Sequence, residues 1–299
     1  MTLAKKFSKV FKEQGFGTAL RVSFEWNLRK TRNVFKKIVW IIAYQLNLFI
    51  MTSFPKSKVD FIIDKLEHEG ISIHPIKINI QEYLDFVSSA DYSPNIYGKV
   101  LAEKSLEHFL SIKLLDFSKE DIFIDIASSN SPFAKIVKKL YGCKVYRQDI
   151  IYPTGIHDET IGSNAASIPL PDKSVTKMTL HCSFEHFERD YDKQFIIEAD
   201  RLLKKGSKLC IIPLYLSQSY IILTDPFVDR KGILWDQGAK PVYLRGYGQR
   251  HGRFYNIEQL RERVLDNKKQ LSFKLFLVEN EKEVDPSCYV KFIALFEKK

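Results

Sequence analysis

Apolar residues from about residue 97 onward follow an alternation of helix-like and strand-like spacing. Val100, Leu106, Leu110 and Leu114 recur at helical intervals, and residues 122–126 form the apolar run of a buried parallel strand. Further strands are predicted at 145–149, 175–182, 208–216, 274–278 and 289–296, and further helices at 133–140, 195–203 and from 257. This alternation predicts a doubly wound α/β sheet that binds ligands at the carboxyl ends of its strands.

Helix-terminal signals support these boundaries. Pro132 suits the first turn of the helix at 133–140, and Gly142 ends it. Asn256 is a helix cap with Gln259 at the capping-box position. Residues 57–96 hold short strand-like and helix-like pieces and end in the turn-rich stretch 89–95. We therefore divide the 299 residues into an extension (1–56), a connecting region (57–96) and a main domain (97–299).

The charge of the chain, +10, is concentrated at its beginning. Residues 1–60 contain twelve Lys or Arg and three acidic residues, whereas the other residues contain 34 basic and 33 acidic side chains. The basic residues alternate with apolar ones, and the apolar run 38–51 is too short for a spanning helix and too late for a signal peptide. Two interpretations stay open: a segment lying on an anionic membrane surface, or a helical pair packed on the main domain.

The basic charge and the cysteine spacing bear on nucleic-acid binding, metal binding and localisation. We do not expect nucleic-acid binding, because no recognised module accompanies the basic charge. Cys143, Cys182, Cys210 and Cys288 are widely spaced, which predicts reduced thiols in a cytoplasmic protein and no metal site. The localisation predicted is thus cytoplasmic, with peripheral contact at the inner face of the membrane if the extension binds lipid. The pattern does not predict an oligomeric state.

The first strand of the main domain leads into a loop suited to a cofactor. It ends near Asp125 and continues into the small residues 127–131 before a helix, so that a ligand can approach the backbone closely. Asp149 ends the next strand, where a carboxylate can accept hydrogen bonds from ribose hydroxyls. The spaced glycines of a dinucleotide-binding loop do not occur here. The combination predicts a nucleoside cofactor.

Over about residues 97–299 the sequence resembles class I S-adenosylmethionine-dependent methyltransferases. The resemblance rests on five segments in order: 125–131, 145–149, 164–175, 181–187 with its Glu-His pair, and 201–209. It implies a Rossmann-like sheet of seven strands, the last antiparallel, and S-adenosyl-L-methionine as cofactor. The cofactor-binding residues that it implies are Asp125, Ala127, Ser128, Ser129, Ser131, Asp149, Asn164, Ala165 and His181.

The cofactor loop departs from the family pattern. Ala127, Ser129 and Ser131 stand where the family usually has glycines. Because their side chains disfavour positive φ, we expect the loop to take a different or tighter path. Asn164 replaces the commoner acid, and its amide oxygen can still accept from the adenine amino group.

Acceptor and base candidates lie at the end of the fourth strand and in a long connection. His181 and His186 are candidate general bases for a hydroxyl acceptor. The alternative for His186 is a structural Glu-His pair that caps the next helix. Residues 217–255 are too long for a turn and are predicted to cover the acceptor. The acceptor-binding candidates there are Arg250, His251, Arg253 and Tyr255, and the alternative is a solvated charged loop.

These observations predict an S-adenosylmethionine-dependent O-methyltransferase that acts on a glycan, a lipid-linked compound or another polar metabolite. The alternative is a non-catalytic binding or assembly protein that keeps the fold with a degenerate cofactor loop. A nucleotide-sugar or dinucleotide enzyme is the third hypothesis.

Overall fold

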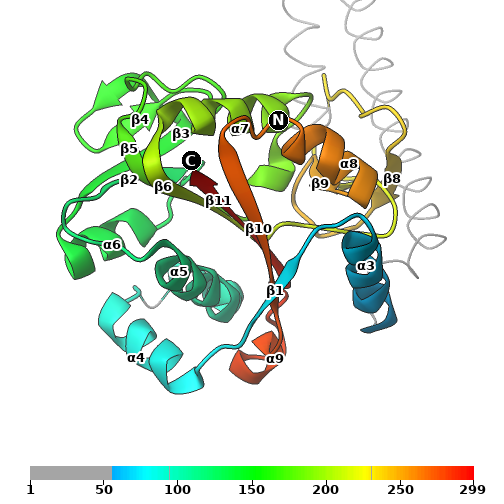
Figure 1. Ribbon diagram of the computed structural model, residues 1–299, viewed down its shortest axis with the longest axis horizontal. Coiled ribbons are helices and arrows are strands. Elements are labelled where there is room, and N and C mark those ends of the chain that lie inside the picture. The colour runs from blue at the N-terminus through cyan, green and yellow to red at the C-terminus, as the bar shows by residue number, and fades with distance from the viewer. Residues whose placement is uncertain (1–55, 94, 230) are drawn as a thin grey trace, which may run out of the picture. The chain divides into compact units, whose positions relative to one another are not determined.

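The computed structural model describes residues 56–93, 95–229 and 231–299 (Figure 1). The basic, apolar pattern of residues 1–55 lies outside this range, so both interpretations of the extension stay open. The chain divides into two units. The larger unit contains the described residues up to Leu223, Lys231–Pro241 and His251–Lys299, and the described residues of the smaller one are 224–229 and 242–250.

An eight-stranded sheet forms the centre of the larger unit, in the order β1-β10-β11-β6-β5-β2-β3-β4. Neighbouring strands are parallel, except that β11 is antiparallel to both β10 and β6. The strands are β1 (Ile73–Ile76), β2 (Ile122–Ile126), β3 (Lys144–His157), β4 (Thr160–Gly162), β5 (Val175–His181), β6 (Leu203–Ile212), β10 (Leu271–Val278) and β11 (Phe292–Lys298). The predicted doubly wound sheet with an antiparallel last strand is confirmed, and β1 adds an edge strand beside β10.

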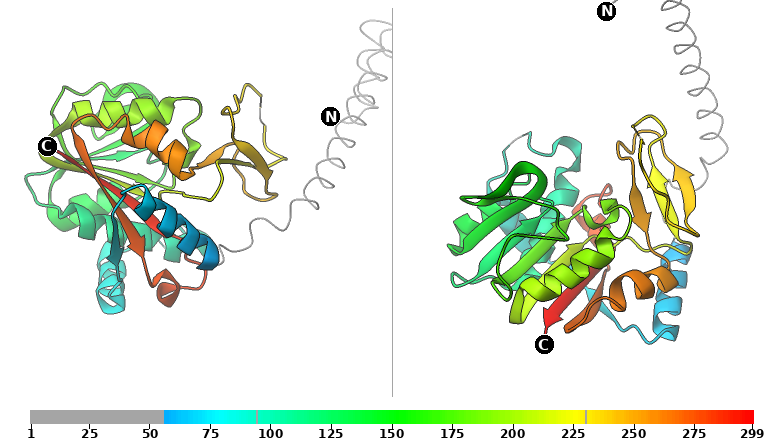
Figure 2. Two further views of the ribbon diagram at one scale, coloured as in Figure 1. Left: turned by 45° about the vertical axis from the view of Figure 1, so that its right-hand side comes forward. Right: turned by 90° about the horizontal axis from the view of Figure 1, so that it is seen from above.

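Helices cover both faces of this sheet (Figures 1 and 2). The helices are α3 (Lys56–His68), α4 (Ile80–Ala90), α5 (Leu101–Leu115), α6 (Phe133–Tyr141), α7 (Tyr191–Leu202), α8 (Ile257–Leu260) and α9 (Glu281–Val284), with short helices η1 (Gly98–Val100) and η2 (Phe184–His186) and the π-helical turn η3 (Arg261–Leu265). Successive strand residues point to opposite faces. Phe123 joins the core under α4, α5 and α6, whereas Ile124 joins the core under α3, α7 and α8.

Most predicted elements of the main domain occur where the apolar pattern placed them. β2 has the predicted limits, α6 ends at Gly142 with φ of +70°, and the Asn256 side chain accepts from the Gln259 amide at 2.9 Å. Some boundaries differ. A strand was predicted at 208–216, but β6 already begins at Leu203, because Leu203 pairs with Val175 of β5 and so extends the ladder.

Residues 57–96, predicted as a connecting region, contribute α3, β1 and α4 to the larger unit. β1 is parallel to β10, with Ile73 opposite Leu275. Just beyond β1, the Ile78 amide donates to Asn280 Oδ1 at 2.7 Å, and Asn280 Nδ2 donates to the Ile78 carbonyl at 3.1 Å. A strand of four residues gains its stability from such partners, which its own sequence does not display.

β3 continues past the predicted end at Asp149 and folds back along β4. Arg147–Asp149 pair in parallel with Thr160–Gly162, and Ile156 and His157 then lie opposite Ile161 and Thr160. Gly162 permits this arrangement, because a Cβ there would lie 1.9 Å from the Pro153 carbonyl oxygen. The fold-back places residues 150–153 next to Asp149.

The long connection 217–255 contains three further strands, β7 (Ile221–Thr224), β8 (Lys240–Tyr243) and β9 (Gly252–Phe254), in the order β8-β7-β9. Ile221 lies opposite Phe254, so the two ends of the connection are paired. In the smaller unit, the Asp225 carboxylate accepts from the amides of Phe227, Gly246 and Gly248 at 2.8–3.0 Å. The connection is thus ordered by strand pairing and by a buried carboxylate.

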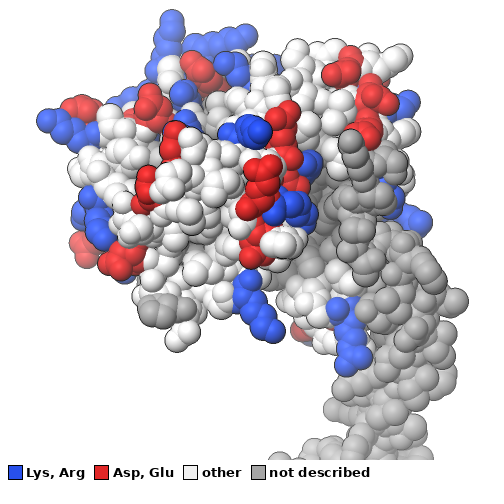
Figure 3. Space-filling view, turned by 90° about the horizontal axis from the view of Figure 1, so that it is seen from below, with Lys and Arg blue, Asp and Glu red and all other residues white. Residues whose placement is uncertain are grey.

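The surface of the described chain has mixed charge. On the face in Figure 3, acidic and basic side chains are interspersed, as expected from the nearly equal numbers of the two kinds beyond residue 60. Among the helices that the structure describes, none has the length and apolar character needed to cross a membrane.

Candidate active site

The loop between β2 and α6 adopts backbone that usually requires glycine. Ala127 has φ of +50° and Ser129 has φ of +44°. For residues with a side chain this left-handed conformation costs about 1–2 kcal/mol each. The expectation that positive φ would be avoided here is wrong, because neighbouring groups hold the loop in this conformation.

Hydrogen bonds from β3 hold the loop. The Ser129 amide donates to Asp149 Oδ2 at 2.8 Å, the Ser128 amide donates to the Gln148 carbonyl at 3.0 Å, and the Ala127 amide donates to Gln148 Oε1 at 3.2 Å. At the far end, Ser131 Oγ accepts from the Phe133 amide at 3.2 Å. Three consecutive amides of the loop are therefore fixed by two residues at the end of the parallel part of β3.

Asp149, predicted to accept hydrogen bonds from ribose hydroxyls, also stabilises the backbone of the protein itself. Its Oδ2 accepts from Ser129, and its Oδ1 accepts from the Ile151 amide at 3.0 Å. Each carboxylate oxygen has two lone pairs, so one on each remains for a further donor. The next two side chains, Ile150 and Ile151, are exposed although they are large and apolar.

Asp125 and His181 meet beneath the loop. Asp125 is buried; its Oδ1 accepts from Thr179 Oγ1 at 2.9 Å, whereas its Oδ2 has no hydrogen-bond partner among the described residues. His181 Nδ1 lies 3.5 Å from Asp125 Oδ1, and His181 Nε2 lies 2.9 Å from Ser111 Oγ. Burial lowers the pKa of His181, so its ring is neutral at neutral pH. The side chain of His181 is only 6% exposed.

Asn164 and Ala165 lie after β4. Asn164 Oδ1 accepts from the Ala166 amide at 2.9 Å, and the Asn164 carbonyl accepts from the Ser167 amide at 3.0 Å. The side chain therefore stabilises its own turn, and its oxygen has a second lone pair for a ligand donor. Ala165 is buried in the core under α7.

His186 and His251 are linked through backbone carbonyls. His186 Nδ1 lies 2.5 Å from the His251 carbonyl, and His251 Nδ1 lies 3.1 Å from the Glu185 carbonyl. Since a carbonyl only accepts, each Nδ1 carries a proton. His186 Nε2 lies 3.5 Å from Glu185 Oε1. Burial lowers the pKa of His251 to about 4, so this ring is neutral.

The segment that contains β2, α6, β3, β5 and most of β6 matches a known family. Residues 124–211 match the model of a methyltransferase domain. This match agrees with the resemblance of the segment to class I methyltransferases. S-adenosylmethionine is the cofactor expected for this domain.

Solved structures similar to the chain have low sequence identity to it. A protein from Pyrococcus horikoshii is 18% identical, with 73% of this chain and 99% of that chain covered and a TM-score of 0.45. The 1,6-didemethyltoxoflavin-N1-methyltransferase of Burkholderia thailandensis, solved with its substrate and S-adenosylhomocysteine, is 12% identical, with 74% and 87% covered and a TM-score of 0.43. The geranyl diphosphate C-methyltransferase of Streptomyces coelicolor is 13% identical, with 71% and 88% covered and a TM-score of 0.43. No curated protein matched the chain.

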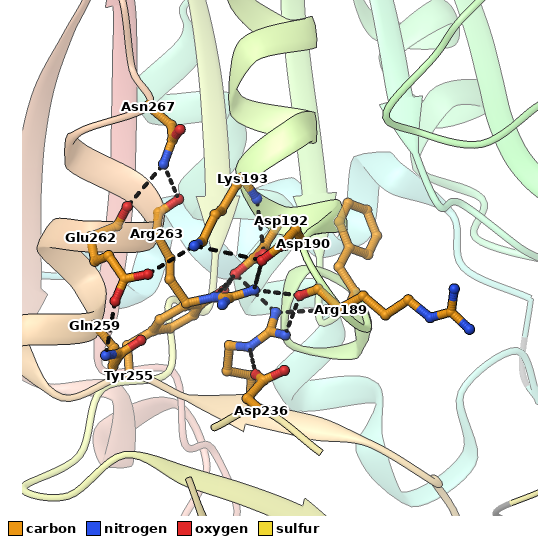
Figure 4. Close-up of polar contacts among 12 residues, drawn as sticks. Arg189, Asp190, Asp192, Lys193, Asp236, Tyr255, Gln259, Glu262, Arg263 and Asn267 are labelled. Carbon is orange, nitrogen blue, oxygen red and sulfur yellow. Dashed lines mark hydrogen bonds and ion pairs between the residues drawn. The ribbon is translucent and has the colours of Figure 1, made fainter. Parts of the chain in front are cut away.

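Arg253, predicted to bind the acceptor, forms ion pairs with Asp192 and Asp236, two residues labelled in Figure 4. Its side chain is 0% exposed and contacts Asp192 at 2.9 Å and Asp236 at 2.7 Å. It also donates to the carbonyls of Phe187 and Arg189, at 2.6 and 2.8 Å. Arg253 therefore fixes the segment that follows Glu185 and His186.

Arg263 and Tyr255 complete this network. Arg263 donates to both oxygens of Asp192, at 2.7 and 2.8 Å, and the Tyr255 hydroxyl donates to Asp192 Oδ2 at 2.8 Å. Figure 4 shows these side chains converging on the first turn of α7. Arg250 belongs to the smaller unit, where its carbonyl accepts from Thr224 Oγ1 at 2.8 Å. The four predicted acceptor residues are thus not gathered in one place within the larger unit.

Sequence reasoning missed a second group of polar side chains, which we call the acidic cluster: Glu103, Lys104, Glu107, Cys182, Glu185, Tyr215 and Tyr289. A helix that places two glutamates four residues apart among apolar residues gave a weak signal, because it presents both on one face. Tyr215 and Tyr289 gave no signal in the sequence, because neither lies in a recognisable motif. In the part of the chain that the structure describes, no three His, Cys, Asp or Glu side chains are grouped so as to hold a metal ion.

Proposed function

We propose that this protein transfers a methyl group from S-adenosylmethionine to a hydroxyl of a polar acceptor, such as a glycan, a lipid-linked compound or another polar metabolite. The observation that carries the proposal is the buried Asp125 Oδ2, which has no partner among the described residues, beneath a loop held in left-handed backbone. A buried carboxylate oxygen without a donor costs about 1–3 kcal/mol or more, which a cationic ligand group would offset.

The residues around the loop fit this cofactor. Asp125 would accept from its ammonium group, and Asp149 retains a lone pair on each oxygen for the ribose hydroxyls. The exposed Ile150 and Ile151 offer apolar surface to the purine, and Asn164 Oδ1 can accept from its amino group. The rest of the cofactor would contact the backbone of the loop and Ala165; the loop residues are Ala127, Ser128, Ser129 and Ser131. When bound, the cofactor supplies a methyl group already activated on a sulfonium.

Of the two histidines predicted as bases, we propose His186. Its side chain is 30% exposed, and the carbonyl of His251 accepts from Nδ1, so Nε2 is the nitrogen that can take a proton. Such a base takes the proton of the acceptor hydroxyl as the oxygen attacks the methyl carbon. His181 lies between Ser111 and Asp125 and is enclosed, so we propose that it positions the Asp125 carboxylate.

Calorimetric titration with S-adenosylmethionine and S-adenosylhomocysteine tests the cofactor. We expect saturable binding by the wild type and at least about tenfold weaker binding by Asp149→Asn, which loses the charge that assists the ribose hydrogen bonds. Asp158→Asn, at an exposed carboxylate after β3, is the matched control and should bind like the wild type. Failure of the folded wild type to bind would overturn the proposal in favour of a non-catalytic binding protein. Preferential binding of a nucleotide sugar or dinucleotide would favour the third hypothesis.

For residues 1–56 we propose contact with an anionic membrane surface, which the twelve basic residues among the first 60 support. Vesicles of phosphatidylglycerol should sediment the full chain but not a variant that lacks residues 1–55. Equal sedimentation of the two proteins would refute membrane contact through the extension.

A further inference from the structure

The acidic cluster lies at the carboxyl ends of two central strands. Cys182 directly follows β5, and Tyr215 follows β6, so both occupy the edge at which a parallel sheet binds ligands. Cys182 Sγ donates to Glu107 Oε1 at 3.0 Å and lies 3.5 Å from the Tyr215 hydroxyl and 3.6 Å from the Tyr289 hydroxyl. One thiol thus connects α5, β5, β6 and the segment before β11.

Two carboxyl oxygens near this edge are buried without a partner among the described residues: Glu185 Oε2 and Glu103 Oε1. Glu185 is only 4% exposed. Burial is the main cause that raises the pKa of the Cys182 thiol and of the Tyr215 hydroxyl, and the charge of Glu185, three residues after Cys182, adds to both shifts. A native protein seldom leaves a buried acceptor unpaired, so the unpaired oxygen points to a donor supplied by a ligand.

The charge balance of the cluster is negative. Lys104 is its one basic side chain, and Lys104 Nζ is already paired with both oxygens of Glu107, at 3.2 and 3.1 Å. Glu185 therefore has no Lys or Arg of the cluster to itself; His186 Nε2 lies 3.5 Å from its Oε1, and its Oε2 has no hydrogen-bond partner among the described residues. A ligand anion would meet the negative charge of this carboxylate, whereas hydroxyl or ammonium groups would satisfy Oε2.

Aromatic rings border the same group. Tyr215 and Tyr289 are stacked, with ring centroids 6.5 Å apart, and Tyr215 contacts Phe254 at 4.8 Å. Tyr289 is 45% exposed, so the cluster reaches solvent at this ring. Rings of this kind provide flat apolar surface with a polar tip, which suits a ligand that combines C–H faces with hydrogen-bond donors.

We propose that the acidic cluster binds the methyl acceptor through Glu185, Tyr215 and Tyr289, and selects a hydroxyl-bearing or amine-bearing ring compound without negative charge. This inference rests on the proposed methyl transfer. It assigns acceptor recognition to carboxylates and tyrosines rather than to Arg253, whose guanidinium is enclosed by Asp192 and Asp236. A site of this kind disfavours phosphates and carboxylates as acceptors.

Three sugars of the same ring distinguish the ligand classes: glucose is neutral, glucosamine is cationic and glucuronate is anionic. Their binding to the full chain is measured by saturation-transfer NMR in the presence of S-adenosylhomocysteine. We expect signals for glucose and glucosamine and none for glucuronate. Glu185→Gln should weaken glucosamine binding about tenfold, the effect of losing one charge-assisted hydrogen bond. Tyr289→Ala, at a largely exposed ring, should weaken both sugars without affecting folding.

Glu120→Gln, at an exposed carboxylate before β2, is the control and should leave sugar binding unchanged. Calorimetry of the same samples with S-adenosylhomocysteine separates the possible failures. If the wild type does not bind S-adenosylhomocysteine, the proposed function is overturned together with this inference. If cofactor binding is intact, any one of three results overturns this inference alone: glucuronate binds as well as glucose, no sugar binds, or neither variant changes sugar binding.

Discussion

Replacing Ser129 by glycine should stabilise the protein, although glycine substitutions usually destabilise. Ser129 has φ of +44° and an exposed side chain. Its amide donates to Asp149 Oδ2, a hydrogen bond that any residue at this position retains. The change therefore removes the strain of a side chain in left-handed backbone and keeps the contact that fixes the loop.

Two opposing quantities set the magnitude. Left-handed backbone costs a residue with a Cβ about 1–2 kcal/mol, which glycine does not pay. The greater freedom of glycine in the unfolded chain costs about 0.4–1 kcal/mol. The difference predicts that Ser129→Gly raises the free energy of unfolding by about 0.5–1 kcal/mol. In a protein of this size the melting temperature should rise by about 1–4 °C.

Urea denaturation of the two variants Ser129→Gly and Asn130→Gly checks the sign. Asn130 is the next residue, is also exposed, and does not have positive φ, so its replacement gains nothing and should cost about 0.4–1 kcal/mol. The two variants should thus shift stability in opposite directions. If Ser129→Gly destabilises as much as Asn130→Gly, the left-handed conformation of the loop imposes no strain and our reasoning is refuted.

Burial raises the pKa of Glu103 to about 8, from 4.5, so the folded protein retains a proton that the unfolded chain loses between these values. The free energy of unfolding should therefore fall as pH rises from 5 to 8. In urea denaturation, this fall should be smaller for Glu103→Gln than for the wild type by about 1 kcal/mol or more. Arg253→Met should lower the free energy of unfolding by about 3–5 kcal/mol, because the largely buried Asp236 carboxylate loses its ion-pair partner, whereas the exposed Arg261→Met should cost under about 1 kcal/mol. Unchanged stability of Arg253→Met in the same assay would restore Arg253 as an acceptor-binding candidate.

The sequence predicted elements whose own residues specify them. The apolar run of β2 and the helix stop at Gly142 need no distant partner to be recognised. β1, β4 and β9 have three or four residues each, and their pairing depends on other segments, which for β1 is the distant strand β10. A short strand of this kind is decided by tertiary contacts rather than by propensity, so its sequence carries little signal.

The candidate site also contains some residues whose placement the sequence predicts and others whose placement depends on tertiary contacts. Asp125 lies in β2 and Asp149 in β3, two strands that the apolar pattern predicted, and Asp149 Oδ2 accepts from the Ser129 amide of the loop. The backbone of Ala127 and Ser129 could not be predicted, since it depends on hydrogen bonds from Gln148 and Asp149 that override local preference. The buried ion pairs of Arg253 likewise depend on residues from three separate segments, whereas its sequence context suggested an exposed loop.

The pairing of β1 with β10 has a consequence for the order in which the chain assembles during synthesis. Ile78 and Asn280, which flank these two strands, are 202 positions apart. A ribosome that adds about 5–20 residues per second needs roughly 10–40 s to make the intervening chain. For that time Ile73–Ile76 has no strand to pair with, and the central strands β2, β3 and β5 can already associate. The edge of the sheet that is first in the sequence is therefore among the last to be completed.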